Sequence, residues 1–335
     1  MKKLSLLPLI APLLLTGCNI AKRTNVGLLY CSAEANSLYQ VNVVKAELES
    51  KGLTTKLLSF TDSNDIASVI NGSIDRLDSL YIPTDNTCAA NAETIDSIVR
   101  AKKKPVFAGE EGLCKVTGAI TLSISYYNIG IKTGEMAVDI LLGKKNIAEM
   151  PIEYDEHPVK KYNPSYCGAI ELTPPEGYVS IEETGGASAS VTITNQNTEN
   201  RKFVVGISQF VTHDALDAAT RGFKDAVKAG LGEDNVTFDE QNAAAQAELC
   251  TTIANSFVSK GVDLIMANAT PSLQAAANST TTIPVLGTSV TEYGVALGID
   301  NFNGLVGSNV SGTSDLAPLA EQSSMLAEVF APFFK

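Results

Sequence analysis

The chain has 335 residues, of which 44% are hydrophobic and 19% charged, and its net charge is −12 at pH 7. This composition is that of a globular protein rather than a disordered one, and the length predicts two domains. The acidic balance argues against nucleic-acid binding, which requires a basic surface. The six cysteines and two histidines show no zinc-like spacing, so we expect no metal site and no cofactor.

The first eighteen residues, MKKLSLLPLIAPLLLTGC, predict a lipoprotein signal peptide (1–18). Two lysines precede an apolar run that is too short to span a bilayer. The last four residues are similar to a bacterial lipobox, and an uncleaved anchor helix fits less well because Pro8 and Pro12 interrupt it. We therefore expect Cys18 to be acylated, so that the chain is extracytoplasmic and held at the membrane by lipid. The other five cysteines are expected to be buried single residues, although a disulfide is not excluded.

From residue 26 onward, apolar strands alternate with amphipathic helices. The first half predicts strands at 26–30, 54–60, 79–83, 105–108 and 118–124 and helices at 37–51, 64–71, 89–101 and 128–142. A polar stretch from about 172 to 200 indicates a linker, with room for a short strand at 188–194. After it we expect strands at 203–207, 235–239, 262–267 and 284–287, helices at 214–230, 244–260 and 271–279, and a final helix within 314–335. This rhythm predicts the α/β class with mostly parallel, doubly wound sheets.

The two halves of the chain match each other. Gly27 and Gly206 lie 179 residues apart in equivalent strands, and the motifs that begin at Pro105 and Pro284 have the same offset. Equal offsets at both ends indicate an internal duplication. We therefore predict two similar lobes, one over 22–170 and one over 203–335, joined by a linker over 171–202.

Polar residues follow the strands where a ligand would bind. In an open α/β sheet, ligands lie beyond the carboxyl ends of strands and against helix N-termini. The carboxylate of Asp85 would bind an α-ammonium group, or would instead cap the helix that follows. A carboxylate group of the ligand would suit the helix N-terminus at Thr270 and Ser272. His213 is expected more as a structural hydrogen-bonding residue than as a ligand contact. The predicted ligand-binding residues are Thr84, Asp85, Asn86, Thr87, Glu110, Tyr126, Gln209, Thr270, Ser272 and Ser289.

No catalytic constellation stands out in the sequence. Glu110 and Glu111 are neighbours and do not face each other as an acid–base pair must. Ser208, His213 and Asp217 lack the G-x-S-x-G motif of a nucleophile elbow. The sequence GEEG at 109–112 lacks the Lys-Ser/Thr of a phosphate loop. We therefore predict a binding protein that is not an enzyme and has no catalytic residues.

Seven segments carry a family resemblance. They are GLLYCSAEANSLYQ, LYIPTDNTCA, KPVFAGEEG, YYNIGIKTGEMAVDIL, GISQFVTHDALDAATRGFKDA, VDLIMANATPSLQAAAN and SGTSDLAP. They resemble the ABC transporter substrate-binding lipoproteins of periplasmic-binding-protein type I (Venus-flytrap) fold, a group that includes tryptophan- and tyrosine-binding proteins. In that family the half like GISQFVTHDALD comes first, whereas here it comes second, so the chain resembles a circularly permuted member.

The resemblance implies a solute-binding lipoprotein of an ABC importer whose lobes close on a small solute. It favours an amino acid, above all an aromatic one, as that solute, and it implies permease and ATPase subunits as partners of a monomer. Three alternatives remain open at this stage. They are a lipoprotein receptor for a signalling system, a binder of nucleosides or sugars, and an enzyme on the same scaffold.

Overall fold

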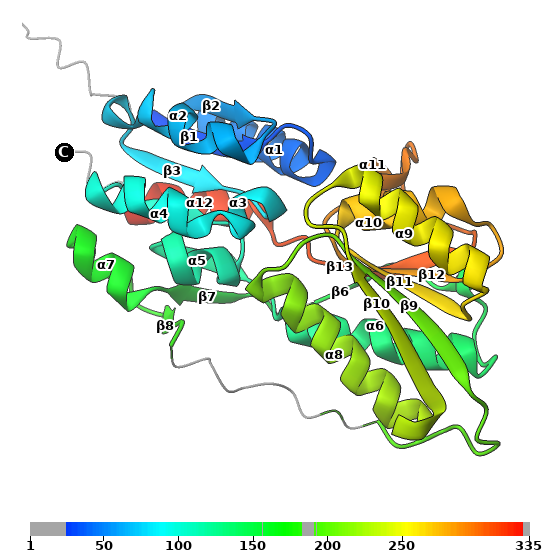
Figure 1. Ribbon diagram of the computed structural model, residues 1–335. Helices are drawn as coiled ribbons and strands as arrows, with labels where there is room; N and C mark the ends of the chain where they lie inside the picture. The colour runs from blue at the N-terminus through cyan, green and yellow to red at the C-terminus, as the bar shows by residue number, and fades with distance from the viewer. Residues whose placement is uncertain (1–24, 156, 183–190, 192, 331–335) are drawn as a thin grey trace, which may run out of the picture.

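The computed structural model describes residues 25–155, 157–182, 191 and 193–330, which form two α/β lobes (Figure 1). Each lobe is built on one mostly parallel sheet with helices packed on its faces. We call the lobe that contains β1 (Asn25–Cys31) the first lobe and the lobe that contains β9 (Phe203–Gln209) the second lobe. The predicted α/β class with two lobes is confirmed.

The first lobe has a seven-stranded sheet in the order β2-β1-β3-β4-β5-β7-β8. Only the β5–β7 pair is antiparallel. Its further strands are β2 (Thr54–Phe60), β3 (Ser79–Ile82), β4 (Val106–Ala108), β5 (Ile120–Ser123), β7 (Val159–Tyr162) and β8 (Val179–Ser180). Its helices are α1 (Ala35–Ser50), α2 (Ile66–Asn71), α3 (Asn86–Ala90), α4 (Ala92–Ala101), α5 (Glu111–Thr117), α7 (Pro164–Ile170) and α12 (Leu319–Phe330). The residues of β3 are all buried, as expected for a central strand of a parallel sheet covered on both faces.

The second lobe has a six-stranded sheet in the order β10-β9-β11-β12-β13-β6, and all its strand pairs are parallel. Its further strands are β10 (Val236–Asn242), β11 (Leu264–Asn268), β12 (Val285–Val290), β13 (Val310–Ser314) and β6 (Glu153–Tyr154). Its helices are α6 (Tyr126–Leu141), α8 (Asp214–Leu231), α9 (Ala247–Lys260), α10 (Thr270–Ser279) and α11 (Tyr293–Leu297). Helices α9, α10 and α11 pack against one another, and α6 packs against α8.

The lobes are not the contiguous stretches 22–170 and 203–335 that the sequence predicts. Helix α6 packs on α8, and β6 pairs with β13, so the segment 126–154 belongs to the second lobe. Helix α12 packs on α1 and contributes to the hydrophobic core of the first lobe. The chain therefore crosses between lobes after β5, between β6 and β7, and between β13 and α12. A crossover leaves no mark in hydrophobic periodicity, because a buried helix face has the same pattern on either sheet.

The predicted duplication is visible in the hydrogen bonds of the two sheets. Asp78 Oδ2 accepts a bond from the N–H of Asn25 at the start of β1 (2.9 Å), and Asp263 Oδ2 accepts one from Val204 in β9 (2.7 Å). In each lobe the aspartate directly precedes the strand that pairs with that first strand. The same residue type thus fixes the same strand register in both lobes.

Glycines bring α6 and α8 close together. A Cβ atom on Gly130 would lie 2.1 Å from the carbonyl oxygen of Ala219, and one on Gly222 would lie 2.1 Å from that of Tyr127. Side chains larger than hydrogen at these positions would therefore push the two helices apart. This contact holds α6, which follows the first crossover, in the second lobe.

Several elements were not expected from the sequence. They are α5, the run β6, β7 and α7 between residues 143 and 171, α11, and β13 before the final helix, while β8 adds an edge strand within the predicted linker. The suggested strand at 188–194 lies mostly outside the described residues, and so does Cys18. The five described cysteines are free and buried, as predicted. No helix in the described ranges has both the length and the apolar character of a membrane span.

Candidate ligand-binding cleft between the lobes

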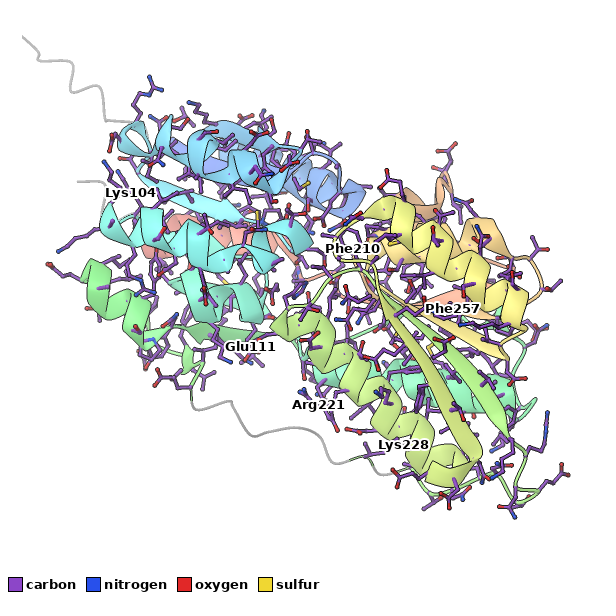
Figure 2. The ribbon with its side chains drawn as sticks, in the orientation of Figure 1. Lys104, Glu111, Phe210, Arg221, Lys228 and Phe257 are labelled. Atoms are coloured by element: carbon purple, nitrogen blue, oxygen red, sulfur yellow. The ribbon has the colours of Figure 1, made fainter. Side chains whose placement is uncertain are left out.

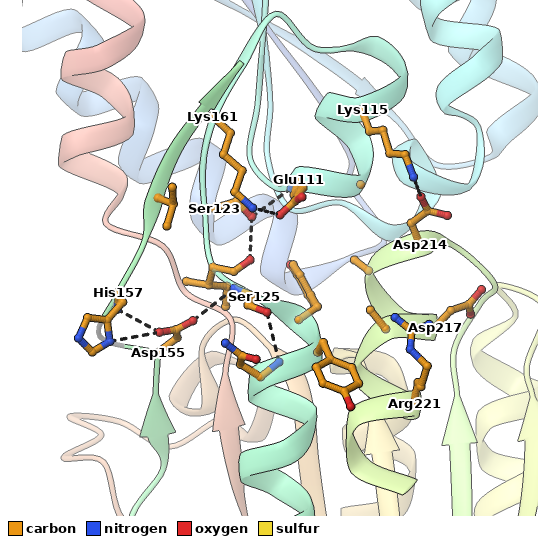
Figure 3. Close-up of a pocket in the computed structure, with 18 residues that line it drawn as sticks. Glu111, Lys115, Ser123, Ser125, Asp155, His157, Lys161, Asp214, Asp217 and Arg221 are labelled. Carbon is orange, nitrogen blue, oxygen red and sulfur yellow. Dashed lines mark hydrogen bonds and ion pairs between the residues drawn. The ribbon is translucent and has the colours of Figure 1, made fainter. Parts of the chain in front are cut away.

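A cavity of about 800 Å³ opens between the two lobes (Figure 3). Residues of α5 and β7 line it from the first lobe, and the N-terminal turns of α6 and α8 line it from the second. Lys115 of α5 pairs with Asp214 of α8 across its rim at 3.1 Å. Phe210, at the end of β9, is buried at the junction of the lobes (Figure 2). We use "interlobe cleft" for this cavity together with the buried residues Asn86, Tyr126 and Asp315 and the partly buried His213 beside it.

Asp85 is held by the backbone of its own lobe. Its Oδ1 accepts a bond from the N–H of Cys88 (2.7 Å) and its Oδ2 one from Cys31 (2.6 Å), and the residue is buried. It therefore caps α3 and ties that helix to the end of β1. Of the two roles that the sequence offers for Asp85, the geometry favours helix capping.

Glu34 occupies the space in front of α3, where Asn86 and Thr87 were expected to contact the ligand. Its carboxylate accepts bonds from the backbone N–H and the side chain of both Asn86 and Thr87, at 2.7–3.1 Å. Burial and the nearby charge of Asp85 raise the pKa of Glu34 to about 7. Thr84 donates its N–H to Gln40, and its carbonyl oxygen accepts from Asn36 and Gln40. The polar run 84–87 is thus largely bonded within the first lobe.

Two more acids are buried, Glu110 of the first lobe and Asp315 after β13. Glu110 caps α5 through the N–H groups of Gly112 and Leu113, and burial raises its pKa to about 7. Asp315 lies at the start of the third crossover and accepts a 2.9 Å bond at Oδ2 from the hydroxyl of Tyr126. Its Oδ1 is buried without a hydrogen-bond partner, and burial raises its pKa. Among the four buried acids Glu34, Asp85, Glu110 and Asp315, only Asp315 has a carboxylate oxygen without a hydrogen-bond partner in the described structure.

The second lobe contributes a helix N-terminus and an unpaired hydroxyl. Helix α10 has no side-chain cap, and Ala269 before it adopts φ 88° and bonds to the carbonyl of Thr288. Ser289 follows Thr288 with φ 54°, and its buried hydroxyl has no partner. Backbone strain at non-glycine residues costs energy and clusters at functional sites. The start of α10 and Ser289 therefore form a small group of free donors.

Two predicted residues are engaged inside the second lobe. Gln209 donates to Asp217 (2.6 Å) and Val211 and accepts from Thr220, so all its side-chain polar atoms are used. The Ser272 hydroxyl bonds to Ser208 at 3.4 Å in the buried layer between β9 and α10. Both residues act as supports of the cleft wall.

One hydrogen bond joins the lobes within the cleft. Nε2 of His213 lies 3.2 Å from Oδ1 of Asn86, and Nδ1 of the same ring is buried without a partner. Burial lowers the pKa of His213 to about 4, so the ring is neutral at pH 7. The two lobes are therefore in direct contact at His213 and Asn86.

A comparison with protein families accounts for this architecture. The family model of the ABC transporter substrate-binding protein matches residues 19–173 and 204–335. This chain belongs to that family. The gap between the two matched segments covers the predicted linker.

Several relatives of this substrate-binding protein have been described. A tyrosine-binding protein of Clostridioides difficile (strain R20291) is 44% identical over 124 residues, which are 36% of this chain and 36% of the relative. The match thus spans about a third of that relative's length. An ABC domain from Streptococcus pneumonia, solved in complex with L-Trp, is 28% identical over 47% of this chain and 56% of that chain, with a TM-score of 0.44.

A sugar-binding structure matches over nearly the whole length. The carbohydrate transporter solute-binding protein from Agrobacterium radiobacter, solved with D-arabinose, covers 93% of this chain and 89% of that chain. Its TM-score is 0.62 and its identity 12%, so the likeness shows the fold alone. It confirms the predicted periplasmic-binding-protein type I fold.

Sequence reasoning placed the candidate site of this substrate-binding protein at the loops that follow the strands, and it did not name Asp315. Asp315 follows β13, which the sequence did not predict, and its contact with Tyr126 joins residues 189 positions apart. Its only sequence signal is its place in SGTSDLAP, one of the family-like segments. Glu34 stands in another such segment, GLLYCSAEANSLYQ, but no rule of spacing marks it as the partner of α3.

Proposed function

We propose that this protein binds a free aromatic amino acid between its lobes for an ABC importer. Membership of the substrate-binding family supports the transport role, and the tyrosine-binding relative supports the ligand class. The single observation that carries the proposal is the unpaired, buried Oδ1 of Asp315 in a cleft that holds several acids.

Asp315 suits the ammonium group of an amino acid. Glu34, Asp85, Glu110 and Asp315 are all buried at the cleft, and none of them has an ion pair with a basic side chain of the described chain. A cluster of acids without cations favours a positively charged ligand group. Only Asp315 has an oxygen without a partner, and the hydroxyl of Tyr126 holds its carboxylate in place. In this proposal Asp315, and not Asp85 as expected from the sequence, binds the ammonium group of the ligand.

The start of α10 suits the ligand carboxylate. Its first turn, which has the N–H groups of the buried Thr270 and Ser272 but none at Pro271, presents the positive end of the helix dipole. Ser289 adds its unpaired hydroxyl to these donors. Thr84 and Asn86 would face the ligand from the first lobe, and Phe210 and Tyr126 supply aromatic walls.

Transport requires a tether and a closing motion. We propose that Cys18 carries the lipid anchor, so that the mature protein works outside the cytoplasm as a monomer beside its permease and ATPase subunits. The three crossovers between the lobes are the hinge about which the lobes would open. Contacts such as His213–Asn86 would break in the open form.

We also propose that the chain is a circular permutation of the family arrangement. Helix α12, at the end of the described chain, lies in the core of the first lobe beside α1, near the other end. A family-order chain would run from α12 directly into β1. The tyrosine-binding relative matches only about a third of either chain, as expected when the halves are exchanged.

Calorimetric titration tests the ligand assignment. L-Tyrosine and L-tryptophan should bind, whereas tyramine, 3-(4-hydroxyphenyl)propionate and D-arabinose should not, since each lacks one or both charged groups. Asp315→Asn should weaken L-tyrosine binding by about 30- to 1000-fold, as expected when one partner of a buried charge pair is removed. Asp300→Asn, at an exposed position, is the matched control and should leave binding unchanged. Binding of arabinose instead of amino acids would overturn the proposal.

A further inference from the structure

A chain of hydrogen bonds runs from Glu34 through Asn86 to His213 across the cleft. The side-chain Nδ2 of Asn86 donates to Glu34 Oε2 at 2.7 Å, and the backbone N–H of Asn86 donates to the same oxygen at 3.1 Å. Above its pKa of about 7 Glu34 is ionised and its oxygens only accept, whereas an amide nitrogen only donates, so this contact then fixes the orientation of the Asn86 amide. Oδ1 of Asn86 therefore faces His213, 3.2 Å from Nε2.

The orientation of Asn86 decides which nitrogen of His213 carries hydrogen. An amide oxygen has no hydrogen to give, so Nε2 of His213 must be the donor in this bond. The ring is neutral at pH 7 and holds a single N–H, which leaves Nδ1 with a free lone pair. That lone pair is buried and has no partner within the described structure. A buried acceptor without a donor is unfavourable, because it has lost its hydrogen bond to water.

We propose that Nδ1 of His213 accepts a hydrogen bond from the side chain of the bound amino acid. This inference rests on the proposed function and narrows it. The ammonium and carboxylate groups of the ligand have their own partners, Asp315 and the start of α10. His213 therefore selects an aromatic side chain that carries a donor, the phenol hydroxyl of tyrosine or the indole N–H of tryptophan, over that of phenylalanine.

The selectivity follows from the mismatch that phenylalanine would leave. A site built to hydrogen-bond a polar group rejects the analogue that lacks it, because a buried polar atom stays unpaired. We expect L-phenylalanine to bind about 10- to 100-fold more weakly than L-tyrosine.

The tautomer is directly measurable because the chain contains only two histidines, His157 and His213. In the His157→Gln variant, the ¹⁵N signals of histidine come from His213 alone. At pH 8, where Glu34 is ionised, we expect a neutral ring with hydrogen on Nε2 and an unprotonated Nδ1, whose signal moves when L-tyrosine or L-tryptophan is added. Hydrogen on Nδ1, or an Nδ1 chemical shift that stays the same when either ligand is added, would overturn the inference.

Two substitutions of His213 separate its two nitrogens. His213→Gln places an amide near the position of Nε2, so it keeps the contact with Asn86 and loses the acceptor at Nδ1. His213→Asn keeps a polar atom near Nδ1 and loses the contact with Asn86. The Gln variant should bind tyrosine and phenylalanine with similar Kd, whereas the Asn variant should still prefer tyrosine.

The outcomes distinguish the inference from the proposed function. If the Gln variant weakens tyrosine, tryptophan and phenylalanine equally, His213 serves only to close the lobes, and the inference is wrong while the amino-acid site stands. If the wild-type protein binds all three with the same Kd, the inference is likewise overturned. If it binds none of them, the proposed function fails and the inference fails with it.

Discussion

Asp85 shows how a residue at the correct place for a ligand is used for the fold. Both of its carboxylate oxygens accept backbone hydrogen bonds that connect β1 to α3. In Asp85→Asn one oxygen becomes an NH₂ group that faces a backbone N–H. We expect the free energy of unfolding to fall by about 1–3 kcal/mol in urea denaturation. Asp75→Asn, whose side chain is 72% exposed, should change it by less than about 0.5 kcal/mol. Unchanged stability of Asp85→Asn would contradict the capping role.

Glu110 should make the protein less stable as pH rises toward neutrality. Its pKa is raised by burial from 4.5 to about 7, so between these values the folded protein keeps a proton that the unfolded chain has lost. The free energy of unfolding therefore falls through this window and levels off above about pH 7. One proton gives a slope of at most about 1.4 kcal/mol per pH unit.

Urea unfolding at pH 5, 6, 7 and 8 checks this prediction. Glu110→Gln cannot titrate and should show a smaller pH slope than the wild-type protein, with the remaining slope due to Glu34, whose pKa is raised in the same direction. Glu93→Gln, at an exposed position on α4, should keep the wild-type slope. A Glu110→Gln variant with the full wild-type slope would show that the titrating group lies elsewhere.

At the residue scale, the sequence could predict the role of a candidate residue only where its contacts are with residues close to it in the chain. Asp85 was a good candidate because a carboxylate after a buried strand and before a helix has two local uses, and the structure shows the capping one. Asp315 and Glu34 depend on contacts 189 and 52 residues away, with Tyr126 and with Asn86. No local pattern encodes such contacts, so only the folded chain reveals them.

At the scale of elements, glycine decides how closely α6 and α8 approach. Gly130→Ala would place a methyl group 2.1 Å from the carbonyl oxygen of Ala219, so the helices would have to separate. We expect a loss of about 1–3 kcal/mol in the free energy of unfolding, or more if the backbone cannot move. Gly168→Ala in α7 is the matched control, since a methyl group there meets nothing within 4 Å. The control should be neutral or stabilising by up to about 1 kcal/mol, because alanine favours helix over glycine.

The sequence predicted helices and strands well where the pattern of buried apolar residues is enough to tell a helix from a strand. The buried strands β1, β3 and β9 have continuous apolar runs, and the amphipathic α4 buries Ala92, Ile95 and Val99 at helical spacing. Helix α5 was missed because its first turn, Glu111-Gly112, lacks an apolar signal and is stabilised by the cap from Glu110. The assignment of α6 to the second lobe depends on a partner helix that begins 88 residues after its own start. Periodicity carries no information about that partner.

At the scale of the whole molecule, the number of covalent connections between the lobes predicts whether the linker can be cleaved without loss of binding. Besides the stretch 183–192, three crossovers join the lobes, after β5, between β6 and β7, and between β13 and α12. If the chain is a circular permutation, the linker only connects what would be the natural ends of the family fold. A protease site that replaces residues 183–190 should therefore be cleavable with little effect. We expect the cut protein to keep its Kd for L-tyrosine within about threefold and to unfold at nearly the same temperature.

A second cut distinguishes a dispensable linker from a generally tolerant fold. A protease site placed after Leu316 would sever the third crossover and release α12, which buries Leu319, Met325 and Leu326 in the first lobe. Burial of side chains of this size contributes about 1.5–3 kcal/mol each, so losing the covalent connection of α12 should lower the melting temperature and weaken ligand binding. For each variant, the melting temperature and the Kd for L-tyrosine are measured by calorimetry on one preparation, before and after cleavage. If the cut at 183–190 abolishes binding as completely as the cut after Leu316, the linker holds the lobes in place. Ligand binding would then need the linker as well as the three crossovers, which would contradict the proposed circular permutation.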